Sequence, residues 1–278
     1  MRRCTSVVAA LLVLACGSAQ DQQASPGTGG ASTAVASAFD GSSGRWVDLT
    51  HAFSSSSVYW PTDTVGFRLE ELAYGHTDGG WFYSSYRYSG AEHGGTHLDA
   101  PIHFAEGRQT NDQIPLSSLI GPAVVVDAPD SAGADYQLGI DDLTRWEGEH
   151  GRIPDGAIVL ARTGWDSRYA DRAAYLGTAL TGPAAVADLH FPGLAPDAAS
   201  WLVANRRIAA FGIDTPSVDY GQSKDFGTHV ALYAANIPGF ENVANLGELP
   251  PSGSFIVALP MKIEGGSGGP LRIVAYVP

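Results

Sequence analysis

Four side chains able to bind a metal ion or to transfer a proton lie close together in the sequence, at His93, His97, Asp99 and His103. All four occupy odd-numbered positions, and alternate residues of an extended chain point to the same face. A helix is disfavoured here, because the stretch also contains a Gly-Gly pair and a proline. Two imidazoles and a carboxylate on one short segment suit a divalent cation. The spacing therefore predicts a metal site with a catalytic role.

The alternative for any single histidine is a core residue whose ring is satisfied by hydrogen bonds. That explanation fits three in-phase histidines and an aspartate poorly, since clusters of possible ligands mark functional sites. A cation bound there lowers the pKa of its water to about 7 and supplies hydroxide at neutral pH. His93 and His97 are the expected nitrogen ligands, and the two oxygens of Asp99 can bridge two ions about 4 Å apart.

The same stretch also resembles a family signature. Residues 93–104, HGGTHLDAPIHF, resemble the HxGTHxDxPxHF motif of the metal-dependent cyclase family, which includes bacterial kynurenine formamidases and isatin hydrolases. This motif is long, and it is much more specific than a lone HxxxH. The resemblance extends over about residues 46–277 and includes three further segments: DLTH with YWP at 48–61, GIDTPSVD at 212–219, and ENVANL at 241–246.

The resemblance implies roles for residues far from the histidine-rich stretch. It makes His229 the nitrogen ligand of a second ion and Glu241 the second bridging carboxylate. It assigns His103 as the proton donor and acceptor, a task that suits an ordinary histidine pKa near 6.5; a further metal ligand is the alternative for His103. It places Trp60 against an aromatic substrate. Three more residues brace the ligands or belong to a plain turn: Asp214, Ser217 and Asp219.

Composition excludes several other classes of protein. The 278 residues suffice for one large domain or two small ones. With 44% hydrophobic and 16% charged residues, the chain is typical of a soluble enzyme rather than a disordered protein. The formal net charge of −13 disfavours nucleic acids and anionic membranes as electrostatic partners. Both cysteines lie among the first 16 residues, so no disulfide framework is expected.

The N-terminal region predicts export. Two arginines precede an apolar run at residues 7–15, which is too short to span a bilayer but suits a signal-peptide core. The sequence VLAC at 13–16 resembles a bacterial lipobox, so residues 1–16 are predicted to be a signal peptide and Cys16 a lipid anchor. Ordinary secretion and a cytoplasmic protein with a misassigned start codon are the alternatives. Residues 17–44, rich in Ala, Gly, Ser, Gln and Pro, predict a flexible linker before a domain at 45–278.

Within that domain, strand signals alternate with helix signals, which predicts an α/β fold. Helices are expected at 140–150, at 196–205, and as one turn from His229 to 235. The resemblance implies more: a swivelling β/β/α domain with a mixed, barrel-like sheet core flanked by helices. Strands are expected at 46–49, 65–69, 81–88, 123–127, 156–162, 208–213, 255–263 and 271–277.

One competing motif lies near the C-terminus. GGSGG at 265–269 formally matches the nucleophile elbow G-x-S-x-G, but that fold needs an acid and a histidine after the serine. No Asp, Glu or His follows Ser267, so a turn between the last two strands is the better interpretation. The glycines also do not form a dinucleotide-binding motif between a strand and a helix.

These observations predict a metal-dependent hydrolase of amide C–N bonds. Zinc, as two ions, is the expected cofactor, and manganese is the alternative because carboxylates are among the ligands. The resemblance implies aryl formamides such as N-formylkynurenine, or cyclic amides such as isatin, as substrates, and a homodimer or higher oligomer. A lactone or ester hydrolase with the same site is the alternative enzyme. An exported protein that only captures a metal or small molecule is the alternative outside enzymes.

Overall fold

The computed structural model describes residues 43–278. The predicted signal peptide, the lipidation site at Cys16 and the predicted linker up to residue 42 lie outside the described residues. Within the part described, no helix is both long and apolar enough to cross a membrane.

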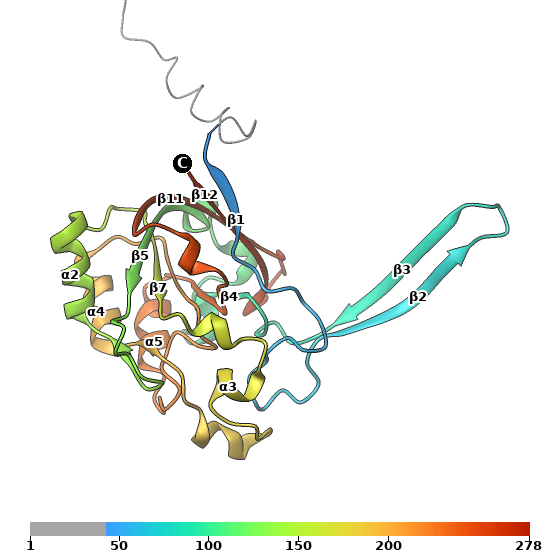
Figure 1. The fold of residues 1–278 in the computed structure, drawn as a ribbon, viewed down its shortest axis with the longest axis horizontal. Helices are drawn as coiled ribbons and strands as arrows, with labels where there is room; N and C mark the ends of the chain where they lie inside the picture. The colour runs from blue at the N-terminus through green and yellow to red at the C-terminus, as the bar shows by residue number, and fades with distance from the viewer. Residues whose placement is uncertain (1–42) are drawn as a thin grey trace, which may run out of the picture.

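The core is a mixed sheet that closes on itself (Figure 1). Four neighbouring strands, β5, β7, β9 and β10, run parallel, and the remaining pairs are antiparallel. Pairing of β12 with β4 joins the two sides of the sheet into a ring, with β1 attached to β12. The order is β1 (Arg45–Asp48), β12 (Gly268–Val277), β11 (Ser252–Pro260), β5 (Ile120–Asp127), β7 (Ile158–Arg162), β9 (Ala210–Ile213), β10 (Gly239–Glu241) and β4 (His97–Asp99).

Helices cover the parallel part of this sheet (Figure 1). Val125 of β5 packs inside the ring, whereas its neighbours Val124 and Val126 pack under the helices. A strand that is buried on both faces needs apolar residues without alternation, which explains the AVVV sequence of β5. The helices are α2 (Ile140–His150), α3 (Arg172–Leu176), α4 (Pro196–Asn205) and α5 (Gly227–Ala234). Short 3₁₀ turns are η1 (Pro101–His103), η2 (Asn111–Gln113), η3 (Leu116–Ser118), η4 (Trp165–Arg168), η5 (Pro183–Asp188) and η6 (Leu246–Glu248).

The α/β class and the barrel-like core are therefore confirmed. The helices predicted at 140–150 and 196–205 coincide with α2 and α4. The turn predicted at 265–269 is shorter than expected, because Gly268 and Gly269 already belong to β12. These two glycines pair with Asp99 and Leu98 of β4 and so complete the ring.

A long hairpin stands apart from the barrel (Figure 1). Within residues 43–278, its strands, β2 (Arg68–His76) and β3 (Phe82–Ser89), pair only with each other. The strand predicted at 65–69 is wrong in position, since the structure begins it at Arg68 and continues it along the hairpin. A second small sheet joins β6 (Gln137–Leu138) to β8 (Gly193–Leu194).

Candidate metal centre and active site

The spacing of the histidine-rich stretch predicted one extended segment, and this prediction is wrong. Only His97 and Asp99 share a strand, β4, where their side chains point away from Leu98 in the barrel core. Gly95, at φ +58°, turns the chain before β4, and η1 carries His103 after it. A left-handed glycine and a proline interrupt the strand on its two sides. The four side chains still converge. They do so because the chain turns before and after β4, and not because alternate residues of one strand point to the same face.

Two further ligand candidates reach this cluster from distant parts of the chain. Glu241 of β10 lies directly opposite His97 of β4 in the sheet. His229 lies in the first turn of α5, and its Nε2 is 3.3 Å from Asp99 Oδ2 and 3.3 Å from Glu241 Oε1. His97 Nε2 is 3.1 Å from Asp99 Oδ1 and 3.4 Å from Glu241 Oε2. The structure therefore brings together all five predicted ligands.

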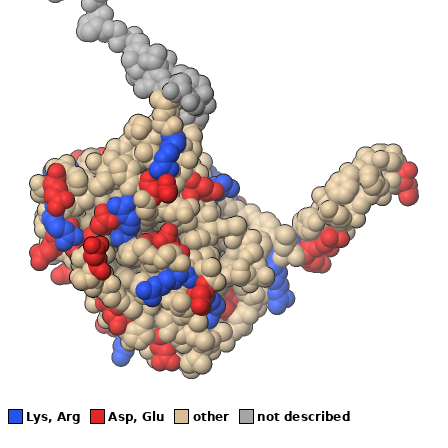
Figure 2. Space-filling model, viewed as in Figure 1, with Lys and Arg blue, Asp and Glu red and all other residues tan. Residues whose placement is uncertain are grey.

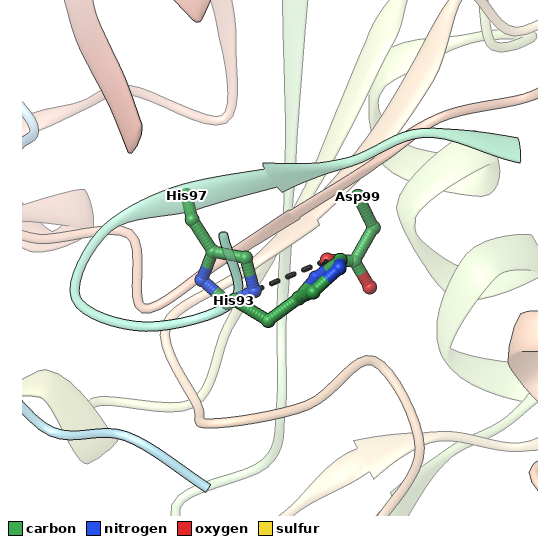
Figure 3. A group of neighbouring side chains, drawn as sticks. All are labelled: His93, His97 and Asp99. Carbon is green, nitrogen blue, oxygen red and sulfur yellow. Dashed lines mark hydrogen bonds and ion pairs between the residues drawn. The ribbon is translucent and has the colours of Figure 1, made fainter. Parts of the chain in front are cut away.

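These side chains form two overlapping groups that suit a metal ion. His93, His97 and Asp99 make one group (Figure 3), and Asp99 joins His229 and Glu241 in the other. In each group the ligand atoms lie within 4.8 Å of one another. Asp99 belongs to both, as the bridging role predicted for it requires. The donor set of imidazoles and carboxylates fits a borderline divalent cation.

The two buried carboxylates of the cluster need a positive charge nearby. Burial alone would raise the pKa of Asp99, but the charge on His93 and hydrogen bonds from the surrounding histidines lower it well below its ordinary value. Burial alone would lower the pKa of His97, yet the nearby carboxylates of Asp99 and Glu241 raise it to about 10. Two buried carboxylates thus attract either protons or a cation. His97 Nε2 is buried without a hydrogen-bond partner in the described structure, as expected of an atom that binds a metal.

Hydrogen bonds on the far side of each ring orient two of the histidines. His97 Nδ1 lies 3.0 Å from the carbonyl oxygen of Gly95, and His229 Nδ1 lies 2.5 Å from Asp219 Oδ2. Both contacts leave Nε2 facing the cluster, which is how proteins commonly fix a metal-binding imidazole. The backbone N–H of Val218 donates to Glu241 Oε1 at 2.9 Å and orients that carboxylate.

Of the three residues predicted to brace the ligands, only one is hydrogen-bonded to a ligand side chain in the described structure. Asp219 touches His229 directly and accepts hydrogen bonds from the first turn of α5. Ser217 lines the cavity beside the cluster. Asp214 instead accepts hydrogen bonds from Thr163 and from the backbone of Gly164, so it braces a neighbouring turn and not a ligand.

His103 lies beside the cluster without belonging to either ligand group. Its ring stacks on that of His93, with centroids 3.8 Å apart and planes inclined by 18°. Burial lowers the pKa of His103 to about 4. The imidazole is therefore neutral at neutral pH, and its pKa lies below the value near 6.5 that best suits the predicted acid–base role.

Sequence reasoning missed a hydrogen-bond donor to Asp99, the carboxylate that the two ligand groups share. The buried Tyr233 hydroxyl donates to Asp99 Oδ2 at 2.8 Å. Tyr233 lies four residues after His229 in α5, and residues four apart share one face of a helix. Helical spacing from His229 could therefore have identified it.

A cavity of about 260 Å³ opens onto the cluster, and aromatic rings form much of its wall. Trp60 lines it as predicted, with its ring 6.5 Å from that of Phe226. Phe226 and Phe104 were missed, since isolated phenylalanines carry no signal of a binding site. The lining residues are Val58, Tyr59, Trp60, His93, Gly94, His97, Asp99, His103, Phe104, Pro216, Ser217, Phe226, His229, Glu241 and Asn242.

Comparison with known proteins agrees with this geometry. The family model described as "Putative cyclase" matches residues 47–220. An isatin hydrolase from Roseibium aggregatum is 35% identical over 226 residues, covering 78% of this chain and 83% of that protein. A kynurenine formamidase from Salinibacter ruber is 29% identical over 228 residues, covering 82% of this chain and 95% of that protein.

Solved structures agree as well. Isatin hydrolase A from Labrenzia aggregata, bound to benzyl benzoate, superposes with a TM-score of 0.80 at 33% identity, over 89% of this chain and 99% of that one. Isatin hydrolase A from Ralstonia solanacearum superposes with a TM-score of 0.79 at 35% identity, over 92% of this chain and 100% of that one. The chain belongs to the putative cyclase family and is a metal-dependent amide hydrolase.

Proposed function

We propose that the protein opens the ring of a planar cyclic aryl amide of the isatin type by hydrolysis of its C–N bond. The observation that carries the proposal is the cavity, because aromatic side chains and the ligand cluster line the same space. A flat aromatic ring fits between such walls, which leaves its amide carbonyl over the cluster. The similarity to isatin hydrolases supports this substrate class over others.

Two cations complete the proposed site, with zinc as the expected metal and manganese as the alternative. His93, His97 and Asp99 would hold one ion, and Asp99, His229 and Glu241 would hold the other. Bound there, the metal supplies a Lewis acid for the carbonyl oxygen and lowers the pKa of a water molecule. Neither a serine nor a cysteine nucleophile is then needed.

His103 moves the proton in this scheme. Its neutral ring accepts a proton from the attacking water and then donates it to the amide nitrogen as the C–N bond breaks. Stacking on His93 fixes the plane of the His103 ring. Trp60 and Phe226 line the cavity, where they contact the substrate ring and exclude water from the apolar part of the cavity.

The test is a comparison of substrates on purified, metal-stripped protein before and after addition of zinc or manganese. We expect metal-restored opening of isatin, with kcat/KM at least about 10-fold above that for N-formylkynurenine or an aryl lactone. Preference for N-formylkynurenine would identify an arylformamidase, the activity of the kynurenine formamidases to which the chain is also similar. Preference for the lactone would identify an esterase. Metal binding without turnover of any of the three would contradict the proposal and indicate a binding protein.

We also propose that the protein is a homodimer built through the β2–β3 hairpin. Tyr74, Trp81 and Phe82 on this hairpin are 66%, 64% and 51% exposed, and the visible face of its shaft carries few charges (Figure 2). An isolated two-stranded hairpin is marginally stable in water and needs a packing partner.

A second copy of the chain is the partner we propose. A groove of about 760 Å³ at the root of the hairpin is lined in part by Phe53, Phe67 and Leu69. Each copy therefore offers one hairpin with exposed aromatic rings and one groove lined in part by apolar side chains, and a two-fold exchange satisfies both at once. Light scattering of the purified protein should give twice the chain mass at micromolar concentration. A monomer at that concentration would contradict the proposal.

Export is proposed on the N-terminal sequence alone. We propose that residues 1–16 direct the protein out of the cytoplasm and that Cys16 becomes lipidated. Fractionation of cells expressing the full chain, with Cys16→Ser as the control, should place the wild-type protein in the membrane fraction and release the variant. Cytoplasmic recovery of both would contradict this assignment.

A further inference from the structure

A short hydrogen-bonded chain connects Glu92 to His93 through Ser267. The Ser267 hydroxyl donates to Glu92 Oε2 at 2.6 Å, and the Ser267 backbone N–H donates to the same oxygen at 3.0 Å. On its other side, Ser267 Oγ lies 2.9 Å from His93 Nε2. The opposite ring nitrogen of His93, Nδ1, lies 2.7 Å from Asp99 Oδ1. One ring nitrogen thus faces the ligand cluster, and the other faces the serine.

The direction of these hydrogen bonds follows from the donors available. A hydroxyl has one hydrogen, and Ser267 gives it to the Glu92 carboxylate, which can only accept. The lone pairs of Ser267 Oγ therefore remain for a proton on His93 Nε2. A neutral imidazole protonated at Nε2 has its lone pair on Nδ1, the nitrogen that faces Asp99. The chain thus favours the tautomer of His93 that can bind a cation through Nδ1.

The glycines around Ser267 are what allow this approach. A Cβ at Gly266 would lie 2.6 Å from Glu92 Oε1. A Cβ at Gly268 would lie 2.6 Å from His93 Cε1 and 2.6 Å from the carbonyl oxygen of Leu98. No side chain fits at either position without displacing the hydrogen-bonded partners. The GGSGG segment, which chain order excludes as a nucleophile elbow, therefore presents its serine to a histidine of the metal site.

We propose that Ser267 and Glu92 are positioning residues that fix the tautomer and ring orientation of His93 for metal binding. The proposal rests on the proposed metal-dependent function of the same site. It gives His93 the kind of support that Gly95 gives His97 and Asp219 gives His229. Because His103 stacks on His93, the same chain also sets the surface against which His103 packs.

The test is the metal affinity of Ser267→Ala in the full chain, measured by competition with a chromophoric zinc chelator. We expect affinity for one zinc ion to fall about 10- to 100-fold, as is usual when the partner of a metal-binding histidine is removed. The absorption spectrum of the cobalt-substituted protein should change as well, because the His93 ring is no longer held in place. The exposed Ser252→Ala, on β11, is the matched control and should retain wild-type affinity.

A double variant tests whether the two residues act as one chain. Glu92→Gln alone should weaken zinc binding, whereas adding it to Ser267→Ala should have little further effect, since the serine link is already absent. Additive effects of the two changes would contradict the proposed chain.

Melting temperatures separate positioning from general stability. With chelator present, Ser267→Ala should melt close to the wild type, and the increase in melting temperature on adding zinc should be smaller in the variant. Wild-type zinc affinity and an unchanged cobalt spectrum in Ser267→Ala would overturn this inference while leaving the proposed function intact. Failure of the wild-type protein itself to bind a cation would overturn the proposed function, and this inference with it.

Discussion

The ligand cluster and the β2–β3 hairpin depart from the usual distribution of residues in opposite ways. The cluster buries charged groups inside the molecule: Asp99, His229 and Glu241 are 1%, 4% and 4% exposed. The hairpin instead exposes large aromatic side chains on two strands that pair only with each other. Buried charge and exposed apolar surface are the two arrangements that folding alone does not favour. These two departures are the basis for the proposed cations at the cluster and the proposed second copy of the chain at the hairpin.

The two regions differ in what holds them in place. The ligands are positioned by the closed sheet and by side-chain and backbone hydrogen bonds. The hairpin has an internal ladder of paired strands, and none of its residues belongs to a buried hydrophobic cluster of the described structure. This difference predicts that single substitutions in the site change metal binding and catalysis without changing the oligomeric state. Substitutions in the hairpin should change the oligomeric state and leave catalysis nearly unchanged.

The largest effect is expected from Asp99→Asn. This change removes one negative charge from both ligand groups, so zinc content should fall and kcat/KM should drop at least about 1,000-fold. Metal analysis together with steady-state kinetics checks both. The exposed Asp155→Asn is the matched control and should behave as wild type. Full zinc content in Asp99→Asn would show that the bridging assignment is wrong.

His103→Ala should separate chemistry from metal binding at this site. Loss of a general acid–base residue lowers kcat by about 100- to 10,000-fold, while zinc content should remain that of the wild type. The comparison also decides between the two roles considered for His103. A variant that loses zinc together with activity would identify His103 as a metal ligand instead of the proton carrier.

The hairpin should give the opposite result. Replacing Tyr74 and Phe82 with serine removes two exposed rings, and we expect the dissociation constant of the dimer to rise at least about 100-fold. The kcat of the variant should stay within about 3-fold of wild type, because neither residue lines the cavity. Light scattering and kinetics on the same samples measure both quantities. Leu180→Ser, at another exposed apolar position, is the control; an unchanged mass in the hairpin variant would contradict the proposed interface.

The smallest effect concerns His51, whose ring stacks on Tyr169 at 3.5 Å. Burial lowers the pKa of His51 from 6.5 to about 4. The unfolded state therefore binds more protons between these values, so stability is full above pH 6.5 and is lost as the pH falls towards 4. His51→Gln should reduce the acid loss of melting temperature over this window by about 2 to 4 °C. An identical pH dependence in wild type and variant would show that His51 does not contribute.

Elements with a strong local signal were predicted from the sequence alone. α4 begins at a proline, has Asp197 in its first turn and buries an apolar side, so its limits follow from local chemistry. The cluster from His93 to His103 was recognisable because its members are close in sequence. In contrast, the strand expected at 81–88 was correctly identified, but its isolation in a hairpin was not. A strand pattern specifies which side chains alternate and does not specify the partner strand.

The sequence by itself determined which residues could bind a metal and, through the family motif, that His229 and Glu241 join them. Only the tertiary structure decided how they meet: closure of the ring sets Glu241 opposite His97, and α5 brings His229 and Tyr233 to Asp99. The support that Ser267 gives His93 also appeared only there. Such contacts join residues more than a hundred positions apart, and local propensity carries no information about which distant segments pack together.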